Sequence, residues 1–413
     1  MSLRCFEEQA FLRRRARLDR IQRPALKFAD RGFGQLKNPK KQDDNPTEPI
    51  LPSSKHRIGI IGVGFGAQVH VPGFRSEGWD VAAICSRNRE KAEKAAAESG
   101  IAGVHTDPLE LIRRDDIEAV AIITPPGAHH DPAIAALRAG KHVLCEKPFA
   151  IDVRQAVEMR EIAAKSGLTA MVAHEFRHTA QRAYIKELLS DGYIGQFQLC
   201  TIELFLDRYA TAAPRPLSWM ASNADGGGLL GALGSHYIDG LRDWFGEVAT
   251  VSGRLTGLRP DVIDTETGTI VKAESDDTFL FTLMFRNGGI ATMIASFAAT
   301  PSRGTRIAVM GDGGTLIAEQ PGPNPMEDGV VIASRNGEAL RELRTPERYT
   351  PFKDPRDHRL MAFRLLVRDF TAGVERHASP APNFTDGLRC QEIIDAVRKS
   401  SESGRTIALD LHD

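Results

Sequence analysis

The feature that most constrains this chain is an apolar strand that runs directly into a glycine-rich turn. Residues Ile58–Ala67 read Ile-Gly-Ile-Ile-Gly-Val-Gly-Phe-Gly-Ala, which is the pattern G-x-G-x-x-A. The first glycine permits a sharp turn, the second lets a pyrophosphate approach the backbone, and the alanine lets the next helix pack on its strand. The N-terminus of that helix offers free N–H groups to phosphates, so the turn predicts a dinucleotide site. The residues expected to form it are Gly62, Gly64, Phe65, Gly66 and Ala67.

From Arg57 to about Ala173, short apolar runs alternate with amphipathic stretches of helical length. The predicted strands are Arg57–Ile61, Asp80–Cys85, Ala119–Thr124, His142–Cys145 and Thr169–Ala173. The predicted helices include Asn88–Ser99, His129–Ala139 and Val153–Ser166. This alternation implies parallel strands joined by crossover helices. We therefore predict an α/β class, with a doubly wound Rossmann sheet over residues 55–173.

The pattern changes beyond Ala173, where strand-like segments follow one another with turns between them. The predicted strands are Gln196–Asp207, Thr250–Leu255, Asp277–Phe285, Ile290–Phe297, Thr305–Met310 and Gly314–Ala318. The predicted helices are Gln181–Ser190, one opened by Gly226-Gly227-Gly228, His358–Ala372 and Asp386–Ser403. Sequential hairpins imply a mostly antiparallel sheet with an open face. Residues 174–413 are therefore predicted to be an α+β domain for substrate binding and oligomerisation, whose closing helices are candidates for packing back on the first domain.

Residues 1–54 differ in composition from the rest of the chain. They carry 12 Lys and Arg against 7 Asp and Glu, and then Pro, Asn and Asp towards Lys55. No apolar segment follows the run Arg13-Arg14-Arg15, so a secretory signal is not indicated. We predict a poorly ordered basic extension, and an organelle-targeting role stays open as an alternative.

The second predicted strand ends in Ser86-Arg87, about where a carboxylate would hold the ribose 2′-hydroxyl of NAD. No carboxylate stands there. A guanidinium binds phosphate through two N–H groups and always carries charge, so Ser86 and Arg87 suit a 2′-phosphate. The alternative interpretation of Arg87 is a solvated loop arginine. We predict NADP(H) as the cofactor, with NAD(H) as the alternative.

Composition excludes several classes of partner. The chain has 413 residues and a formal net charge of −1, which gives room for two domains and no basic excess for nucleic acid. No apolar run approaches the ~20 residues that cross a bilayer. The five cysteines are scattered without a C-x-x-C pair, which favours reduced, buried thiols and a cytoplasmic location. His129 and His130 lack ligand-spaced partners, so no metal site is predicted.

Several motifs occur together in one order along the chain. They are the glycine turn at Gly62, Thr124-Pro125-Pro126 with His129, Gly140-Lys141-His142-Val143 leading into Glu146-Lys147-Pro148, and Gly226-Gly227-Gly228 with Gly234-Ser235-His236. In this series the chain resembles the Gfo/Idh/MocA oxidoreductases, which include glucose–fructose oxidoreductase and inositol dehydrogenases. The resemblance covers roughly Lys55 to the C-terminus. It implies a homo-oligomer and adds Thr124, Pro125, His129, Glu146 and Lys147 to the cofactor site.

Lys147 is the first candidate catalytic residue. It follows a strand of the predicted Rossmann sheet at the carboxyl edge, where such sheets place their ligands. An ammonium there can polarise a substrate oxygen and stabilise the alkoxide that forms before hydride leaves its carbon. Pro148 stiffens the backbone beside it. An isolated Lys-Pro would indicate a surface lysine, whereas this series of motifs favours catalysis.

His236 is the second candidate, because an imidazole titrates near neutrality and can take and return a hydroxyl proton. It lies near the edge of an apolar helical stripe, as expected for a residue at a cleft. The residues alone leave a core histidine equally open, and the resemblance favours a general base. The family's usual aspartate one turn earlier is replaced by Ala232. Asp239 and Asp225 are the nearest substitutes in the sequence, although neither shares its face and turn.

Weaker candidates for contact with substrate follow the last strand of the Rossmann sheet, namely His174, Glu175 and Arg177. The loop before the glycine triplet is a candidate for covering the site and carries Arg208, Arg215 and Trp219. Each also fits an ordinary polar or packing role.

The main hypothesis is an NADP(H)-dependent oxidoreductase that interconverts hydroxyl and carbonyl on a sugar, polyol or related small metabolite. Ala232 motivates a second hypothesis, a dinucleotide-binding regulator or partner protein without catalysis. The resemblance supplies a third, a cofactor-dependent glycosidase with no net redox change.

Overall fold

The computed structural model describes residues 56–64, 67–211, 213–327 and 329–411, which belong to one compact unit within Leu51–Asp413. The predicted extension at residues 1–54 lies outside the described residues, as do Phe65 and Gly66 of the glycine turn.

The first half of this unit is a six-stranded sheet in which every neighbouring pair is parallel. Its strand order is β3-β2-β1-β4-β5-β6, the order of a doubly wound dinucleotide-binding sheet. The strands are β1 (His56–Ile61), β2 (Trp79–Cys85), β3 (Gly103–His105), β4 (Ala119–Ile122), β5 (His142–Cys145) and β6 (Ala170–Val172). The predicted Rossmann fold is confirmed. Strand β3 was not predicted, because its three half-buried residues form no apolar run.

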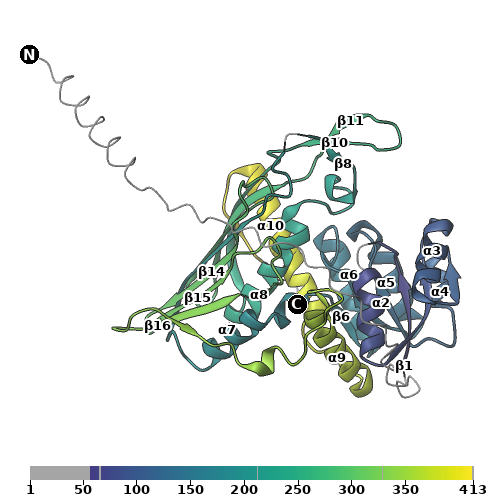
Figure 1. Ribbon diagram of the computed structural model, residues 1–413, viewed down its shortest axis with the longest axis horizontal. Helices are drawn as coiled ribbons and strands as arrows, with labels where there is room; N and C mark the ends of the chain where they lie inside the picture. Colours follow the sequence, from purple (N-terminus) through teal and green to yellow (C-terminus); the bar gives the residue numbers. More distant parts are fainter. Residues whose placement is uncertain (1–55, 65–66, 212, 328, 412–413) are drawn as a thin grey trace, which may run out of the picture. The chain divides into compact units, whose positions relative to one another are not determined.

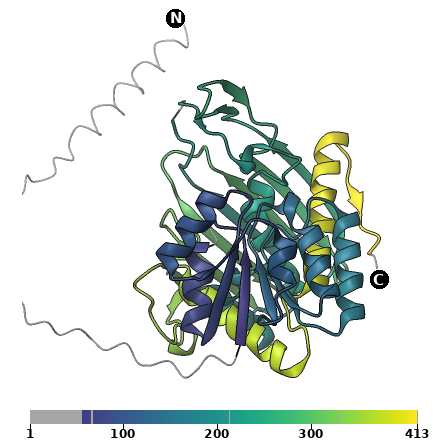
Figure 2. The ribbon, with the colours of Figure 1, turned by 90° about the vertical axis from the view of Figure 1, so that its right-hand side faces the viewer.

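Helices cover both faces of this sheet (Figure 2). They are α2 (Ala67–Ser76), α3 (Arg89–Ser99), α4 (Pro108–Ile112), α5 (His130–Arg138) and α6 (Val153–Ser166), with a 3₁₀ turn at Pro126–Ala128. Local chemistry sets their ends: the Asn88 side chain accepts from Lys91 N at the start of α3, and Asp152 accepts from Gln155 N at the start of α6. These caps place α3 and α6 within a residue of their predicted bounds.

The second half is a nine-stranded sheet in the order β17-β16-β15-β14-β7-β13-β12-β9-β18. Its strands are β7 (Phe197–Phe205), β9 (Val248–Thr256), β12 (Thr278–Phe285), β13 (Ile290–Ser296), β14 (Gly304–Gly311), β15 (Gly314–Gln320), β16 (Val330–Arg335), β17 (Arg341–Leu343) and β18 (Ile407–Ala408). The central pair β7–β13 is parallel and the other pairs are antiparallel. The prediction of a mostly antiparallel sheet is confirmed.

One face of the large sheet carries helices, and the described part of the chain places no helix on the other face (Figure 1). The helices of this half are α7 (Ala180–Ser190), α8 (Ser235–Phe245), α9 (Leu360–Arg376) and α10 (Phe384–Ser403), with 3₁₀ turns at Glu175–His178, Trp219–Ala221 and Glu347–Tyr349. Helix α10 packs on β9 and on α6, and α9 packs on α2. The two closing helices therefore contact the Rossmann half.

A small three-stranded sheet was not predicted. It consists of β8 (Arg215–Pro216), β10 (Asp261–Ile263) and β11 (Ile270–Lys272). Its strands have two or three residues and β11 is fully exposed, so the sequence offers no apolar alternation to reveal them. None of the helices among the described residues combines the length and apolar character that crossing a bilayer requires.

Candidate active site

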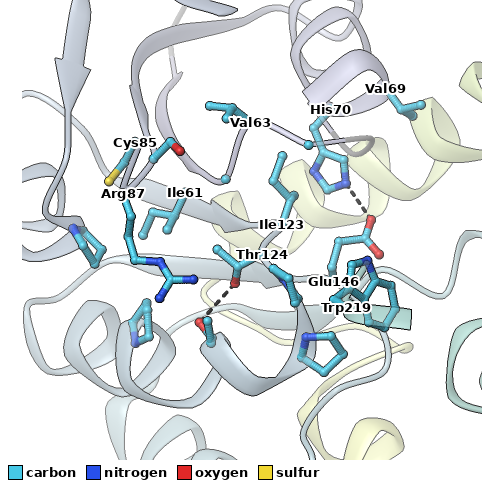
Figure 3. Close-up of a pocket in the computed structure, with 18 of the residues that line it drawn as sticks. Ile61, Val63, Val69, His70, Cys85, Arg87, Ile123, Thr124, Glu146 and Trp219 are labelled. Atoms are coloured by element: carbon cyan, nitrogen blue, oxygen red, sulfur yellow. Dashed lines mark hydrogen bonds and ion pairs between the residues drawn. The ribbon is translucent and has the colours of Figure 1, made fainter. Parts of the chain in front are cut away.

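A cavity of about 700 Å³ opens along the carboxyl ends of the Rossmann strands (Figure 3). This is the size range of a small-molecule or cofactor site. It is lined by Ile61, Gly62, Val63, Gly64, Val69, His70, Cys85, Ser86, Arg87, Asn88, Lys91, Pro108, Ile123, Thr124, Pro125, Pro126, Ala128, Pro132, Glu146, Lys147, Glu175, Trp219, Arg359 and Phe363. In Figure 3, Arg87 marks one end, Glu146 and Trp219 mark the other, and Thr124 lies between them.

The glycine turn forms one wall of this cavity. Gly62 has φ +120°, and a Cβ there would lie 2.8 Å from Ile123 Cγ1 and 2.9 Å from its carbonyl carbon. Only glycine fits that backbone and that space. A Cβ on Gly64 would meet nothing within 4 Å, so this backbone faces the open cavity, as close approach of a pyrophosphate requires. Ala67 starts α2 and packs on the core beneath rather than lining the cavity.

The Arg87 end of the cavity carries positive charge. Ser86, Arg87, Asn88 and Lys91 line it, and Asn88 accepts from Lys91 N as the cap of α3. The two carboxylates among the described lining residues, Glu146 and Glu175, follow β5 and β6 instead. Lys91 was missed by the sequence analysis, although its place in the first turn of the helix after Arg87 could have indicated it.

Thr124 and Pro125 line the middle of the cavity, but His129 does not. The His129 side chain is fully buried, with Nε2 2.7 Å from Thr124 O and Nδ1 3.3 Å from Phe149 O. Burial lowers the pKa of this imidazole, although the carbonyls of Thr124 and Phe149 that face its nitrogens oppose the shift. The prediction that His129 contacts the cofactor is corrected to a supporting role under the turn.

Glu146 is held by a histidine that the sequence analysis did not select. His70 Nε2 lies 2.7 Å from Glu146 Oε1, and Lys147 N donates to Glu146 Oε2 at 3.1 Å. Burial opposes ionisation, but the hydrogen bond with His70 and the charge of Lys147 lower the pKa of Glu146 to about 2. Glu146 therefore stays ionised at the cavity wall and fixes the start of the Glu-Lys-Pro segment.

Lys147 lines the cavity, and its Nζ donates to Ala232 O at 3.2 Å. Ala232 lies in a π-helical turn, Leu230–Gly234, that leads into α8. Such turns are rare and often occur at functional sites. Ala232 thus contributes its carbonyl oxygen to holding the ammonium.

His236 lies in α8 behind the cavity wall, not at its surface. Its side chain is 1% exposed and stacks on Phe176, with ring centroids 3.7 Å apart. Burial, and the charges of Lys147, His174 and Arg182, hold the pKa of this imidazole well below its usual range. The expected position at the edge of a cleft is therefore corrected: a neighbouring group, not the ring itself, lines the cavity here.

That group is Glu175, at the start of the 3₁₀ turn after β6. Its Oε1 lies 4.0 Å from His236 Nε2, and the residue lines the cavity. Neither carboxylate suggested by the sequence takes this place. Asp239 is buried in an ion pair with Arg177, and Asp225 is exposed, with its carbonyl accepting from Gly127 N.

Arg177 is a structural residue, contrary to its predicted contact with substrate. Its Nη2 lies 2.6 Å from Asp239 Oδ1 and 3.2 Å from Asp386 Oδ1, and its Nη1 lies 2.9 Å from Asp243 Oδ1. These pairs use its guanidinium to join the turn after β6 to α8 and α10. Arg177 is absent from the described cavity lining for that reason.

The other weak candidates divide. Trp219 lines the cavity. His174 is buried beside His236, with ring centroids 5.6 Å apart, and does not reach the lining. Arg208 lies over the Phe297 ring and Arg215 over the Tyr209 ring, and both line a separate pocket. The prediction that these two arginines cover the site is corrected.

The residues present fit a dinucleotide. A glycine turn with open backbone, a cationic end and an ammonium at the opposite end provide the complementary groups in one continuous cavity. Within the described ranges, no group of three or more His, Cys, Asp or Glu side chains is arranged to hold a metal ion.

Comparison with known proteins agrees with this geometry. Residues 56–174 match an oxidoreductase family with an NAD-binding Rossmann fold, and residues 186–409 match its C-terminal alpha/beta domain. The chain belongs to the Gfo/Idh/MocA family of oxidoreductases. Its cofactor is accordingly a nicotinamide dinucleotide.

Relatives share most of their length with this chain. An uncharacterized oxidoreductase of Synechocystis is 29% identical over 360 residues, which span 85% of this chain and 95% of that protein. Levoglucosan dehydrogenase of Pseudarthrobacter phenanthrenivorans is 27% identical over 380 residues, 83% and 95% of the two chains. The crystal structure of an oxidoreductase domain protein from Kribbella flavida has a TM-score of 0.78 at 29% identity, covering 86% of this chain and 99% of that one. A levoglucosan dehydrogenase complex with NADH and L-sorbose has a TM-score of 0.77 at 23% identity, with the same coverage, which shows a shared fold.

Proposed function

We propose that this chain is an NADP(H)-dependent oxidoreductase that interconverts hydroxyl and carbonyl on a sugar, polyol or related small metabolite. The observation that carries the proposal is the single cavity in which Arg87 and Lys91 line one end and Lys147 the other, beside the glycine turn. Relatives such as levoglucosan dehydrogenase support the substrate class by their names.

The glycine turn, Arg87 and Lys91 would hold the dinucleotide in this cavity, and its nicotinamide would supply the hydride-transfer chemistry. Lys147 polarises the substrate oxygen and stabilises its developing negative charge, since a preorganised cation in a partly dry site is effective there. The carbonyl of Ala232, which precedes α8, accepts a hydrogen bond from the ammonium and so fixes its position. His236 serves as proton donor or acceptor, and the stacked Phe176 ring fixes its plane.

The choice of NADP(H) over NAD(H) rests on charge. The 2′-phosphate would meet Ser86, Arg87 and Lys91, at an end of the cavity where the described lining has no carboxylate. The levoglucosan dehydrogenase complex contains NADH, so this proposal separates the chain from that neighbour. Titrating the purified protein with NADPH and NADH in parallel should show tighter binding of NADPH. Equal affinities, or a preference for NADH, would contradict it.

The reaction is tested by steady-state assays with NADP⁺ and NADPH on a broad panel of polyols, sugars and aldehydes. We expect turnover with some members of the panel. Tight NADPH binding without any turnover, and no effect of changing His236, would instead favour the regulator suggested by Ala232. Release of a sugar leaving group without accumulation of reduced cofactor would favour the glycosidase.

We also propose that two copies associate through the uncovered face of the large sheet. Leu280 and Ile294 lie opposite each other on β12 and β13, and Met284 lies further along β12. Their exposed fractions are 47%, 39% and 42%, unusually high for neighbouring large apolar residues on one face. Leu280→Arg should shift the protein to a smaller species in light scattering. A wild-type protein that is monomeric at micromolar concentration would contradict this proposal.

A further inference from the structure

A buried carboxyl oxygen without a hydrogen-bond partner lies near His236 at the cavity wall. Glu175 Oε2 is buried, and no hydrogen-bond partner for it occurs among the described residues. The other oxygen, Oε1, lies 4.0 Å from His236 Nε2. Glu175 lines the cavity together with Lys147, whereas the His236 side chain is 1% exposed and lies behind it.

The distance between Glu175 Oε1 and His236 Nε2 leaves room for one substrate oxygen to contact both groups. At 4.0 Å the two groups are too far apart for a direct hydrogen bond. An oxygen atom forms hydrogen bonds at about 2.7–3.0 Å, so one hydroxyl oxygen can contact both groups at once. Lys147, which is to polarise the same oxygen, lines the same cavity.

One short turn positions both members of this pair. The 3₁₀ turn Glu175–His178 presents Glu175 to the cavity, and the next residue, Phe176, stacks on the His236 ring at 3.7 Å. Arg177 of the same turn is tied to Asp239 of α8 by two hydrogen bonds, Nε–Oδ2 of 2.7 Å and Nη2–Oδ1 of 2.6 Å. The turn after β6 and the helix that carries His236 are therefore held together at two points beside the pair.

We propose that Glu175 is a catalytic acid–base of this site, which takes and returns the substrate hydroxyl proton while the neutral His236 contacts the same oxygen. This inference rests on the proposed oxidoreductase function. It also gives the site a carboxyl group, which Ala232 does not provide.

The charges around the pair support this role. The charged and titratable groups that act on it are Glu146, Lys147 and Arg359 around Glu175, and Lys147, His174 and Arg182 around His236. Burial and the nearby negative charge of Glu146 raise the pKa of Glu175 to about 8, although Lys147 opposes the shift. Burial first, then the positive groups, lowers the pKa of His236. At neutral pH the proton of this pair therefore resides on Glu175 and the imidazole is neutral.

The step balances without any further reagent. In oxidation, the hydroxyl O–H bond breaks and its proton passes to the Glu175 carboxylate, while the C–H bond breaks and hydride leaves with both electrons for the nicotinamide. The carbon becomes a carbonyl and Glu175 a carboxylic acid, which returns its proton to water through the cavity that it lines. Reduction runs in reverse, with the acid form of Glu175 donating.

The inference predicts opposite pH dependences for the two directions. Oxidation needs the carboxylate, so its rate should rise through about pH 8. Reduction needs the carboxylic acid, so its rate should fall above about pH 8. A site that used His236 alone would titrate at lower pH in both directions, because the pKa of His236 is depressed.

The test compares Glu175→Gln, Glu175→Asp and a matched control, Glu161→Gln, whose carboxylate is 49% exposed on α6 and paired with Lys165. We expect Glu175→Gln to lose about 10²-fold or more in kcat, the scale of general acid–base catalysis, together with the pH 8 step. Glu175→Asp should keep a pH-dependent step at reduced rate, and Glu161→Gln should match wild type. Wild-type kcat and pH profile in Glu175→Gln would overturn the inference. So would equal losses in the Gln and Asp variants with the pH 8 step unmoved, because these would show a purely structural role.

A second readout needs no turnover. In pH-difference infrared spectra of the protein alone, the carbonyl band of a protonated carboxyl should titrate near pH 8 and be missing from Glu175→Gln. Its absence from wild type would overturn the inference even if the enzyme is active. If wild type turns over no member of the panel while the band is present, the proposed function fails and the protonation of Glu175 still stands.

Discussion

The two ends of the cavity are built in different ways. The cofactor end is made by two segments close in sequence, the turn after β1 and the residues after β2, which contain Gly62 and Arg87. The reaction end is assembled from the loops after β5 and β6 and from α8. The first end consists of backbone and surface charge, whereas the second contains buried titratable groups whose pKa values are displaced in opposite directions. Displaced pKa values of this kind mark the end where protons move.

The largest effect is expected where the reaction end is anchored to the rest of the fold. Arg177→Met would leave Asp239 and its neighbours as uncompensated buried carboxylates. Breaking a buried ion pair on one side costs about 3–5 kcal/mol of unfolding free energy. Denaturant unfolding should show this loss of free energy. The affinity for NADPH should stay unchanged at denaturant concentrations where the variant is still folded. Wild-type stability would contradict the structural role assigned to Arg177, and the exposed Arg89→Met serves as control.

The next effect separates binding from chemistry at Lys147. Lys147→Met removes the ammonium that stabilises developing charge on the substrate oxygen, which should lower kcat by about 10²-fold or more. Cofactor affinity should change far less, because the phosphate-binding turn is untouched. Stopped-flow or steady-state kinetics measure kcat, and a fluorescence titration measures the cofactor affinity. Near-normal turnover would remove Lys147 from the mechanism. The control is Lys165→Met, whose side chain is 78% exposed on α6.

At the cofactor end, a substitution should alter the preference for NADPH over NADH rather than kcat. Arg87→Gln removes the charge proposed to meet the 2′-phosphate, so NADPH affinity should fall by about 10- to 100-fold, as for a charge-assisted hydrogen bond. NADH affinity and kcat should remain within a few-fold of wild type. Arg89→Gln, two residues further on and paired with Glu93, should leave the preference unchanged. Parallel loss of NADPH and NADH affinity would show that Arg87 supports the fold instead of the phosphate.

The smallest expected effect is on the pH dependence of the protein's stability, through Glu175 at the reaction end. The pKa of Glu175 is raised from 4.5 to about 8 in the folded protein, so the stability it contributes is full below about pH 4.5 and is lost as pH rises towards 8. Glutamine does not titrate. The melting temperature of Glu175→Gln minus that of wild type should therefore increase by about 2 °C or more from pH 5 to pH 8. A constant difference in melting temperature across this range would contradict the raised pKa.

Most of the fold could be predicted because its signals are local. The strand before Gly62, the apolar runs and the caps of α3 and α6 specify their own segments, and the confirmed Rossmann sheet and antiparallel sheet follow from their order. The strand β16, with six residues, was missed. The other missed strands, β3, β8, β10, β11, β17 and β18, have only two or three residues each. Pairing of strands that short is decided by tertiary contacts that leave no periodic pattern in the sequence.

Less of the candidate site could be predicted, because the residues that contact one another there come from distant segments of the chain. Nothing near His129 indicates that its two nitrogens face backbone carbonyls of separate loops, and nothing near Arg177 indicates three acidic partners from α8 and α10. The sequence shows that Ala232 provides no carboxylate, and it offers Asp239 and Asp225 as the nearest substitutes. Glu175 comes from another element and meets His236 only through folding.

The most direct test of the central claim is to follow the hydride itself. Protein would be incubated with reduced NADP deuterated at C4 and with each carbonyl compound of the panel, and the products analysed by mass spectrometry. The account predicts that one deuterium appears on the new carbinol carbon for at least one compound, and that Lys147→Met slows its appearance by about 10²-fold. Bound cofactor that transfers no deuterium to any product would contradict oxidoreductase function at this site.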